Sequence, residues 1–321
     1  METSPMPALK RTIEAHTEGF YKGTTTVEFS PDGRILASAG HDCAVRFWDP
    51  DTGEQILHLP GHKDAVTALA FFPDGKTLAS GDHGSIWVWD VQSGELKWKA
   101  LAHYGWVHSV AVSPDSTRVL SVCENLRVWD AATGDEVFAT TDEKKLHTAV
   151  TVAPDGSRAA FNTGSMIRIF DLENCDEVEV LGRHRQEVKS LHFSPDGALL
   201  ASAGKEGAVK IWNVETGEET AVMKVGSLAG WCVRFSPTSS IVASDGYQKP
   251  ADGLLRLWDA NSGKELANCV AQPDVDIEMQ GSHLAIYTLA FSPDGKTLAS
   301  GAGDGTVKLW DVDAILAGEQ R

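Results

Sequence analysis

The sequence predicts an all-β fold made of seven copies of one four-stranded unit. Two short patterns carry this prediction. Ser-Pro-Asp-Gly, or a near copy, begins at Ser30, Phe72, Ser113, Ala153, Ser194, Ser236 and Ser292. Trp-Asp, or a near copy, begins at Trp48, Trp89, Trp129, Phe170, Trp212, Trp258 and Trp310. Successive copies of the second pattern are 40 to 52 residues apart, so the repeat covers nearly all of the 321 residues.

The second repeat shows why each unit is expected to form four strands, a to d in chain order. Val66–Phe72 is apolar, Thr77–Gly81 is short, Ser85–Trp89 is rich in β-forming residues, and Leu96–Leu101 completes the unit. The turn at Phe72–Gly75 suits a hairpin, because proline presets φ and glycine accepts a positive φ. Helical periodicity is missing throughout the chain.

Gly61-His62 followed by Trp89-Asp90, within a period of about 40 residues, resembles the WD40 repeat. Seven such repeats imply a seven-bladed β-propeller of four-stranded antiparallel blades, a single domain over residues 1–321. Residues 16–311 hold the repeats. Residues 9–15 are expected to complete the last blade and close the ring, which leaves 312–321 as a C-terminal tail. The close similarity among repeats, as at Ser292–Ser300, resembles bacterial members of the family.

The composition of the chain argues against several classes of function and location. The net charge of −17 argues against binding nucleic acid through phosphates, which requires clustered Lys and Arg. No apolar run approaches the ~20 residues of a membrane helix, and the N-terminus lacks the pattern of a secretory signal. The five cysteines are widely spaced and never form a Cys-x-x-Cys pair, which indicates free thiols in a reducing compartment. We expect a cytoplasmic protein that is a monomer on its own.

The repeats contain many Ser, His and Asp residues that invite a hydrolase interpretation. In WD40 proteins such residues form hydrogen-bonded networks within a blade, and the resemblance implies this structural role here. The residues concerned are His16, Ser38, Asp42 and Trp48 in blade 1, His62, Ser80, Asp82 and Trp89 in blade 2, and His283, Ser300, Asp304 and Trp310 in blade 7. A catalytic triad would occur once rather than recur, and no Gly-x-Ser-x-Gly motif is present. We expect no catalytic residue.

Metal and cofactor sites lack sequence support as well. His41-Asp42-Cys43 and Asp82-His83 offer ligand atoms without the spacing of a known metal motif. No glycine-rich phosphate loop occurs, so we expect no metal and no cofactor.

The two faces of the predicted ring differ. The a–b and c–d turns lie on one face, here called the turn face, and the b–c and d–a connections lie on the other, the loop face. The turn face repeats one acidic turn, as at Asp51–Glu54, and is interpreted as a solvated surface. The loop face carries three irregular segments, Ala15–Thr24, Asp245–Ala251 and Val270–His283, on adjacent blades.

Alignment on the proline of Ser-Pro-Asp-Gly predicts which side chains surround the mouth of the channel on the loop face. Six residues before it lie Thr25, Thr67, His108, Thr148, Lys189, Trp231 and Tyr287, and Trp106 lies eight before. Exposed aromatic residues often dominate binding to a protein partner, although Trp231 and Tyr287 fit a packing role between blades equally well. The predicted partner-binding residues are Trp106, His108, Trp231, Tyr287, Lys189, Lys205, Tyr21 and Tyr247.

The sequence therefore favours a non-catalytic scaffold that binds a protein or peptide on the loop face. Two alternatives stay open. One is a sensor of a small ligand at the mouth of the channel, and the other is an enzyme with its site at the same place.

Overall fold

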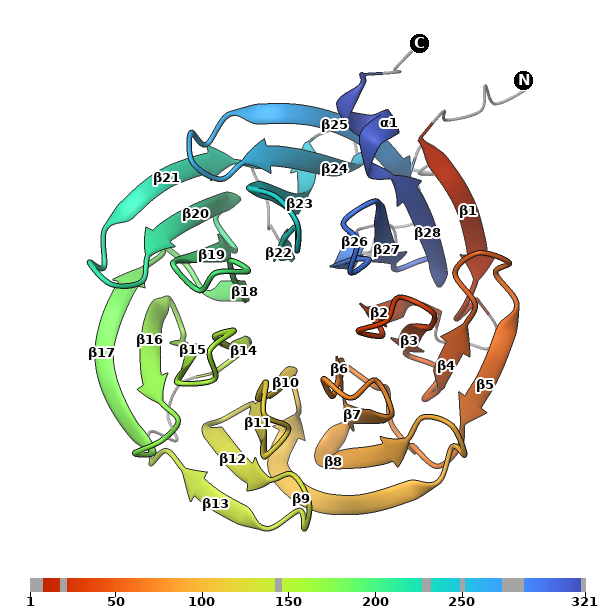
Figure 1. The fold of residues 1–321 in the computed structure, drawn as a ribbon, viewed down its shortest axis with the longest axis vertical. Coiled ribbons are helices and arrows are strands. Elements are labelled where there is room, and N and C mark those ends of the chain that lie inside the picture. Colours follow the sequence, from red (N-terminus) through yellow and green to blue (C-terminus); the bar gives the residue numbers. More distant parts are fainter. Residues whose placement is uncertain are drawn as a thin grey trace.

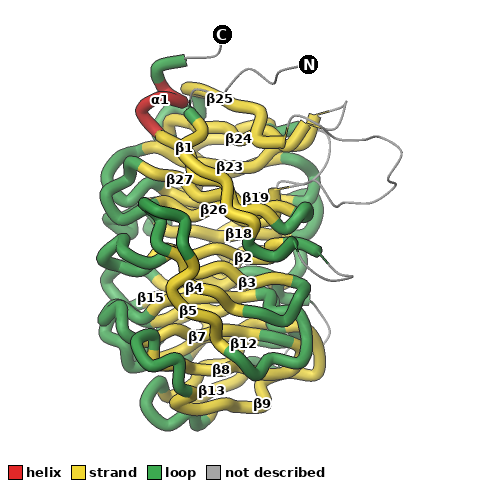
Figure 2. Tube along the Cα trace, turned by 90° about the vertical axis from the view of Figure 1, so that its right-hand side faces the viewer, coloured by secondary structure: helices red, strands yellow, loops and turns green. Residues whose placement is uncertain are grey.

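The computed structural model describes residues 8–17, 22–141, 146–226, 232–248, 252–272 and 286–318. In these residues, strands β1 to β28 form seven four-stranded antiparallel sheets, which stand like blades around a central axis (Figure 1). The predicted seven-bladed propeller is confirmed. Each sheet runs from its first strand at the channel to its fourth strand at the rim, and the turns and loops gather on the two faces of the ring (Figure 2).

The strands of the first four blades have the following bounds. Blade 1 contains β2 (Thr24–Phe29), β3 (Leu36–Gly40), β4 (Val45–Trp48) and β5 (Gln55–Leu59). Blade 2 contains β6 (Ala68–Phe71), β7 (Thr77–Gly81), β8 (His83–Asp90) and β9 (Leu96–Trp106). Blade 3 contains β10 (Ser109–Val112), β11 (Arg118–Val122), β12 (Leu126–Asp130) and β13 (Glu136–Ala139). Blade 4 contains β14 (Val150–Val152), β15 (Arg158–Thr163), β16 (Met166–Asp171) and β17 (Asp176–Arg183).

The remaining blades follow the same plan. Blade 5 contains β18 (Val188–Phe193), β19 (Leu199–Gly204), β20 (Ala208–Asn213) and β21 (Glu219–Lys224). Blade 6 contains β22 (Val233–Phe235), β23 (Ile241–Gln248), β24 (Asp252–Asp259) and β25 (Glu265–Gln272). Blade 7 contains β26 (Ile286–Phe291), β27 (Thr297–Ala302), β28 (Thr306–Asp311) and, at its rim, β1 (Leu9–Glu14).

The N-terminal strand closes the ring, as predicted. β1 runs antiparallel to β28, with Ile13 opposite Val307 and Glu14 opposite Thr306. Ile13 is buried between blades 7 and 1. The last blade is therefore assembled from both ends of the sequence, which holds the ring together without a covalent link.

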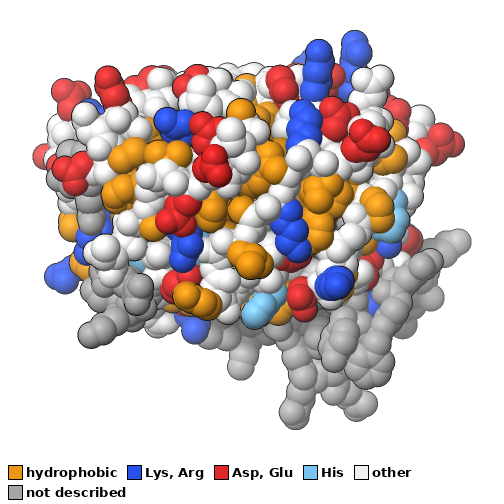
Figure 3. Space-filling view, turned by 90° about the horizontal axis from the view of Figure 1, so that it is seen from below, with side chains coloured by type: hydrophobic (Ala, Val, Ile, Leu, Met, Phe, Trp, Pro, Cys, Tyr) orange, Lys and Arg blue, Asp and Glu red, His pale blue; other side chains and the backbone are white. Residues whose placement is uncertain are grey.

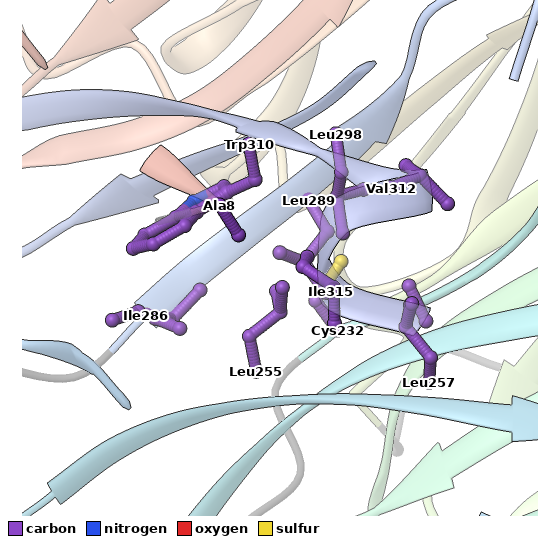
Figure 4. Close-up of a cluster of buried hydrophobic side chains, with 12 residues drawn as sticks. Ala8, Cys232, Leu255, Leu257, Ile286, Leu289, Leu298, Trp310, Val312 and Ile315 are labelled. Carbon is purple, nitrogen blue, oxygen red and sulfur yellow. The ribbon is translucent and has the colours of Figure 1, made fainter. Parts of the chain in front are cut away.

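The C-terminal tail contains an element that the sequence analysis missed. Val312–Leu316 forms a short helix, α1, and the Asp311 carboxylate caps it by accepting a hydrogen bond from the Ala314 backbone N–H at 3.0 Å. Val312 and Ile315 pack into the core between blades 6 and 7, beside Trp310 and Leu255 (Figure 4). One helical turn is too short to show a periodic apolar pattern in the sequence.

Two strands extend beyond their predicted ends. The outer strand of blade 2, β9, continues past Leu101 to Trp106, with a register shift opposite His83 to Ser85 of β8. In blade 6, Asp245–Gln248 belongs to β23 rather than to a loop, because the inserted residues continue the ladder until Gln248 pairs with Asp252. That insertion lengthens a hairpin on the loop face.

Adjacent blades pack through their apolar faces. Ala37, Val45 and Phe47 of blade 1 share a core with Leu69 and Trp89 of blade 2, and similar clusters lie between other neighbouring blades. Burial of such side chains supplies the main stabilisation, roughly 25 cal/mol for each Å² of apolar surface. Among the described residues, no helix has the length and apolar character needed to cross a membrane.

Candidate functional site

The central channel opens on the loop face into a cavity of about 300 Å³. The first strand of each blade supplies its wall, and the residues at the predicted mouth position line it: Thr25, Thr67, His108, Thr148, Lys189 and Tyr287. The seventh predicted mouth residue, Trp231, lies outside the described residues. The proline-based alignment therefore places the described members of this set around one opening.

The three threonines at the mouth connect neighbouring blades. The Thr67 hydroxyl donates a hydrogen bond to the Val107 carbonyl of blade 3 at 2.6 Å. Thr25 donates in the same way to the Val66 carbonyl of blade 2, and Thr148 to the Val188 carbonyl of blade 5. These hydroxyl groups therefore hold the inner strands of successive blades together.

The other three described mouth positions carry His108, Lys189 and Tyr287, which introduce charge and aromatic surface. The Lys189 ammonium lies 2.7 Å from the Glu187 carboxylate. Burial, reinforced by the nearby Lys189 charge, lowers the pKa of His108, so its imidazole is neutral at physiological pH. The mouth thus combines a neutral imidazole, an ion pair and a half-buried tyrosine.

Trp106 does not line this cavity. It ends β9 at the rim side of blade 2, opposite His83, and their rings meet edge to face at 5.0 Å. The sequence predicted Trp106 near the mouth, whereas the structure makes it the last residue of β9, the strand of blade 2 farthest from the channel. Trp106 stays 38% exposed and remains on the loop face.

Two exposed residues near Trp106 escaped the sequence analysis. Leu101 is 83% exposed and Tyr104 is 92% exposed, the highest values among the large hydrophobic side chains in the described part of the chain. The sequence does contain a signal for the exposure of Tyr104, because it follows His103 as the charged Lys63 follows His62 in the previous repeat. Figure 3 shows the outer wall over β9 and β13, where hydrophobic side chains lie among Lys, Arg, Asp and Glu.

The remaining predicted partner residues are Lys205, Tyr247 and Tyr21. Lys205 is exposed in the b–c turn of blade 5, and its backbone N–H donates to the Glu187 carbonyl at 2.9 Å. Tyr247 lies in β23 opposite Gly253, but its side chain is outside the described residues, as is the whole of Tyr21.

The Ser, His and Asp residues of blades 1 and 2 come together inside their blades. In blade 2 the His62 ring lies 2.8 Å from Asp82 and 2.9 Å from the Ser80 hydroxyl, which accepts a hydrogen bond from Trp89 at 2.8 Å. Blade 1 repeats this arrangement with His16, Asp42, Ser38 and Trp48. In blade 7 Trp310 donates to Ser300 at 2.9 Å and Asp304 accepts from Thr306, while His283 is outside the described residues.

Blades 3 and 5 contain versions of this network that the sequence analysis did not identify. His103 contacts Ser121 at 2.9 Å, and His184 contacts Ser202 at 2.7 Å. In each case a glutamate takes the place of the aspartate: Glu124 in blade 3 and Glu206 in blade 5. The change from aspartate to glutamate, together with a serine-to-acid spacing that varies from blade to blade, hid the equivalence in sequence.

Burial, hydrogen bonds and neighbouring charges together set the charge states in these networks. Burial lowers the pKa of His103 to about 4, against the opposing effect of Glu124. For Asp42, burial is outweighed by the hydrogen bond and charge of His16 together with Arg46, and the pKa falls to about 2. The serine hydroxyl groups are fully buried and bonded to tryptophan, so they are placed to hold strands together rather than to meet a substrate.

Several aspartates of the turn face accept hydrogen bonds within their own turns. The Asp90 carboxylate accepts hydrogen bonds from the backbone N–H groups of Gln92 and Ser93, at 3.1 and 2.9 Å. These bonds lower the pKa of Asp90, and Asp49 and Asp130 act in the same way. No group of three or more His, Cys, Asp or Glu among the described residues has the arrangement of a metal site.

A closed ring of four-stranded sheets, most with a Trp–Ser hydrogen bond at the same place, defines a β-propeller of repeated blades. The family model for the WD domain, G-beta repeat, matches residues 8–49, 53–90, 94–130, 175–213, 224–259 and 277–311. These segments make up more than half of the sequence. The chain belongs to the WD40 family.

Among curated proteins, the chain is 28% identical to the transcriptional corepressor LEUNIG_HOMOLOG of Arabidopsis thaliana, over 88% of this chain and 34% of that protein. It is 26% identical to the nuclear distribution protein PAC1 of Arthroderma otae, over 96% and 62% respectively. Apoptotic protease-activating factor 1 of Rattus norvegicus is 26% identical, over 77% and 17%. The chain thus spans less than two thirds of each relative, and their eukaryotic sources give no support to a resemblance to bacterial members.

Proposed function

We propose that the protein is a non-catalytic scaffold that binds a protein partner on the loop face. The observation that carries the proposal is the contrast between the two faces. On the turn face, aspartates such as Asp49, Asp90 and Asp130 are bonded within their own turns, whereas the loop face presents Trp106, Tyr104 and Leu101 to solvent. Aromatic anchors of this kind supply much of the affinity at protein interfaces.

The buried networks support the non-catalytic part of the proposal. A serine nucleophile must reach a substrate, yet Ser38 and Ser80 are completely buried and each accepts a tryptophan N–H. Membership of the WD40 family supports the scaffold role. We also propose a cytoplasmic location, and the five free thiols support it because they suit a reducing environment.

The charge near the mouth supports a partner segment with acidic groups. Lys205 is exposed and Lys189 lies at the opening, in a chain whose net charge is −17. Such charges steer association and mainly change the on-rate. The aromatic residues would contribute the larger part of the affinity.

The test compares the two faces with one partner captured by proximity labelling. Trp106→Ala and Tyr104→Ala should each weaken binding by ~2 kcal/mol or more, with unchanged circular dichroism. Glu54→Lys and Glu218→Lys on the turn face serve as controls and should leave the binding isotherm unchanged. Loss of binding in the turn-face variants alone would assign the interaction to the other side of the ring.

A further inference from the structure

One level of the channel wall combines three ionisable side chains. Three residues before the proline of each Ser-Pro-Asp-Gly turn, four blades carry small residues: Ala70, Ala111, Thr151 and Ala290. The other three carry Glu28 on β2, His192 on β18 and Arg234 on β22. This level, here called the waist, lies deeper in the channel than the mouth.

The waist stands where two cavities meet. The cavity at the mouth has a volume of about 300 Å³, and a second of about 250 Å³ lies toward the turn face. Glu28, His192 and Arg234 line both of them. A small molecule that entered the channel would therefore meet all three side chains.

Arg234 and His192 provide hydrogen-bond donors that are fixed in position. One Arg234 nitrogen donates to the Ser190 hydroxyl at 3.1 Å and to the Val233 carbonyl at 2.9 Å. Its other N–H groups bond to no described residue. The His192 Nδ1 atom accepts the Phe235 backbone N–H at 3.2 Å, which leaves the ring proton on Nε2. Burial lowers the pKa of His192 to about 3, so the ring stays neutral.

Glu28 is the unusual member of the waist. Within the described part of the chain, its carboxylate has no hydrogen bond and no ion pair within 4 Å, although Arg234 faces the same cavity. Burial inside the ring raises the pKa of Glu28 to about 7, against the opposing charge of Arg234. A carboxylate and a guanidinium thus share the channel without contact, and both have capacity left for a ligand.

We infer that the waist binds a small zwitterion, with an ammonium group at Glu28 and a carboxylate at Arg234 and His192. An anion alone would place its charge next to Glu28, and a cation alone would place its charge next to Arg234. When Glu28 is ionised, only a ligand with both groups leaves no partly buried charge unpaired, which is the costly outcome. The α-amino acids are the simplest members of this class. The inference does not depend on the loop-face proposal, because the residues lie below the mouth.

The experiment uses three probes: glycine, and acetate and methylamine, which each carry one of its two charged groups. Titrations followed by protein NMR at about pH 8, above the pKa of Glu28, should show saturable binding of glycine at least about tenfold tighter than either other probe. Equal affinities for glycine and acetate, or no saturable binding of glycine, would overturn the inference.

Substitutions separate the two ends of the ligand. Glu28→Gln should weaken glycine about tenfold and leave acetate unchanged or tighter, because it removes only the anionic partner. Arg234→Gln should abolish binding of both probes. Thr151→Ala, at the same level of the channel, is the matched control and should bind glycine normally. Thermal melting curves establish that each variant is folded, and a Glu28→Gln protein that binds glycine like the wild type would refute the assignment.

Discussion

Blades 2 and 4 have the same four-stranded architecture but different interiors. Blade 2 is held by the His62, Asp82 and Ser80 network, with Trp87 stacked on Trp89 at 5.4 Å. Blade 4 has Phe161 and Phe170 where blade 2 has Ser80 and Trp89, and both rings are buried. The WD-repeat model matches blade 2 but passes over residues 131–174, which contain most of blade 4.

A single amide replaces much of the missing network in blade 4. The Asn162 side-chain oxygen accepts hydrogen bonds from the backbone N–H groups of Thr148 and Ala149, both at 2.9 Å. Its nitrogen donates to the Gly164 carbonyl at 3.0 Å. The comparison shows that the polar network is one of several ways to hold the inner strand in place, and that ring geometry is retained when the motif is lost.

The largest loss of stability should result from preventing ring closure, because both kinds of blade depend on it. Deletion of residues 1–15 would expose the edge of β28 and the apolar surface covered by Ile13. We expect a lower melting temperature than in any point variant, together with aggregation on size-exclusion chromatography. A truncated protein that melts normally and elutes as a monomer would show that closure is not essential.

The next test removes the amide of blade 4. Asn162→Ala leaves two buried backbone N–H groups without an acceptor and should cost about 3 kcal/mol in the free energy of unfolding. Denaturant titration measures the loss, which should be at least as large as that of His62→Ala in blade 2. A cost below that of His62→Ala would mean that the phenylalanine packing alone holds blade 4.

A fall in pH should reduce the stability contributed by a histidine network, as in blade 3. It should not affect the contribution of Asn162 in blade 4, because an amide does not titrate. The pKa of His103 is about 4 in the folded protein and about 6.5 in the unfolded chain, so the unfolded state binds more protons between these values. Stability present above about pH 6.5 is therefore lost as the pH falls toward 4, by on the order of 2–3 kcal/mol from His103. His103→Gln should show a shallower pH dependence of the unfolding free energy than the wild type. Parallel slopes for the two proteins would contradict this.

The contrast between blades also explains what sequence reasoning could predict. Turn motifs such as Phe72–Gly75 recur once per blade, so the number of strands, the closing role of residues 9–15 and the mouth position of His108 followed directly. Placement of Trp106 depended on the extension of β9 past Leu101, which leaves no trace in the spacing of motifs. The residues of the waist occupy the same position in each repeat, three before the proline, so the sequence alone can align them. That Glu28, His192 and Arg234 line two cavities is shown only by the structure.

The smallest effect concerns the network of blade 2 itself. His62→Ala removes two hydrogen bonds from a buried site and should cost ~1–3 kcal/mol. Asp82 keeps one partner in this variant, because it also accepts the Trp87 N–H at 2.9 Å. The loss should therefore be partial, and the His62–Asp82 coupling in a double-mutant cycle with Asp82→Asn should be ~1 kcal/mol.

Asn162→Ala measured in the His62→Ala background provides the control for that cycle. The two sites lie in different, non-adjacent blades and share no side-chain partner, so their effects should add to within about 0.5 kcal/mol. A large coupling energy between them would mean that the network of one blade affects the stability of a distant blade. Each blade would then not be an independent unit, and the tolerance of blade 4 for a different interior would require compensation elsewhere in the propeller.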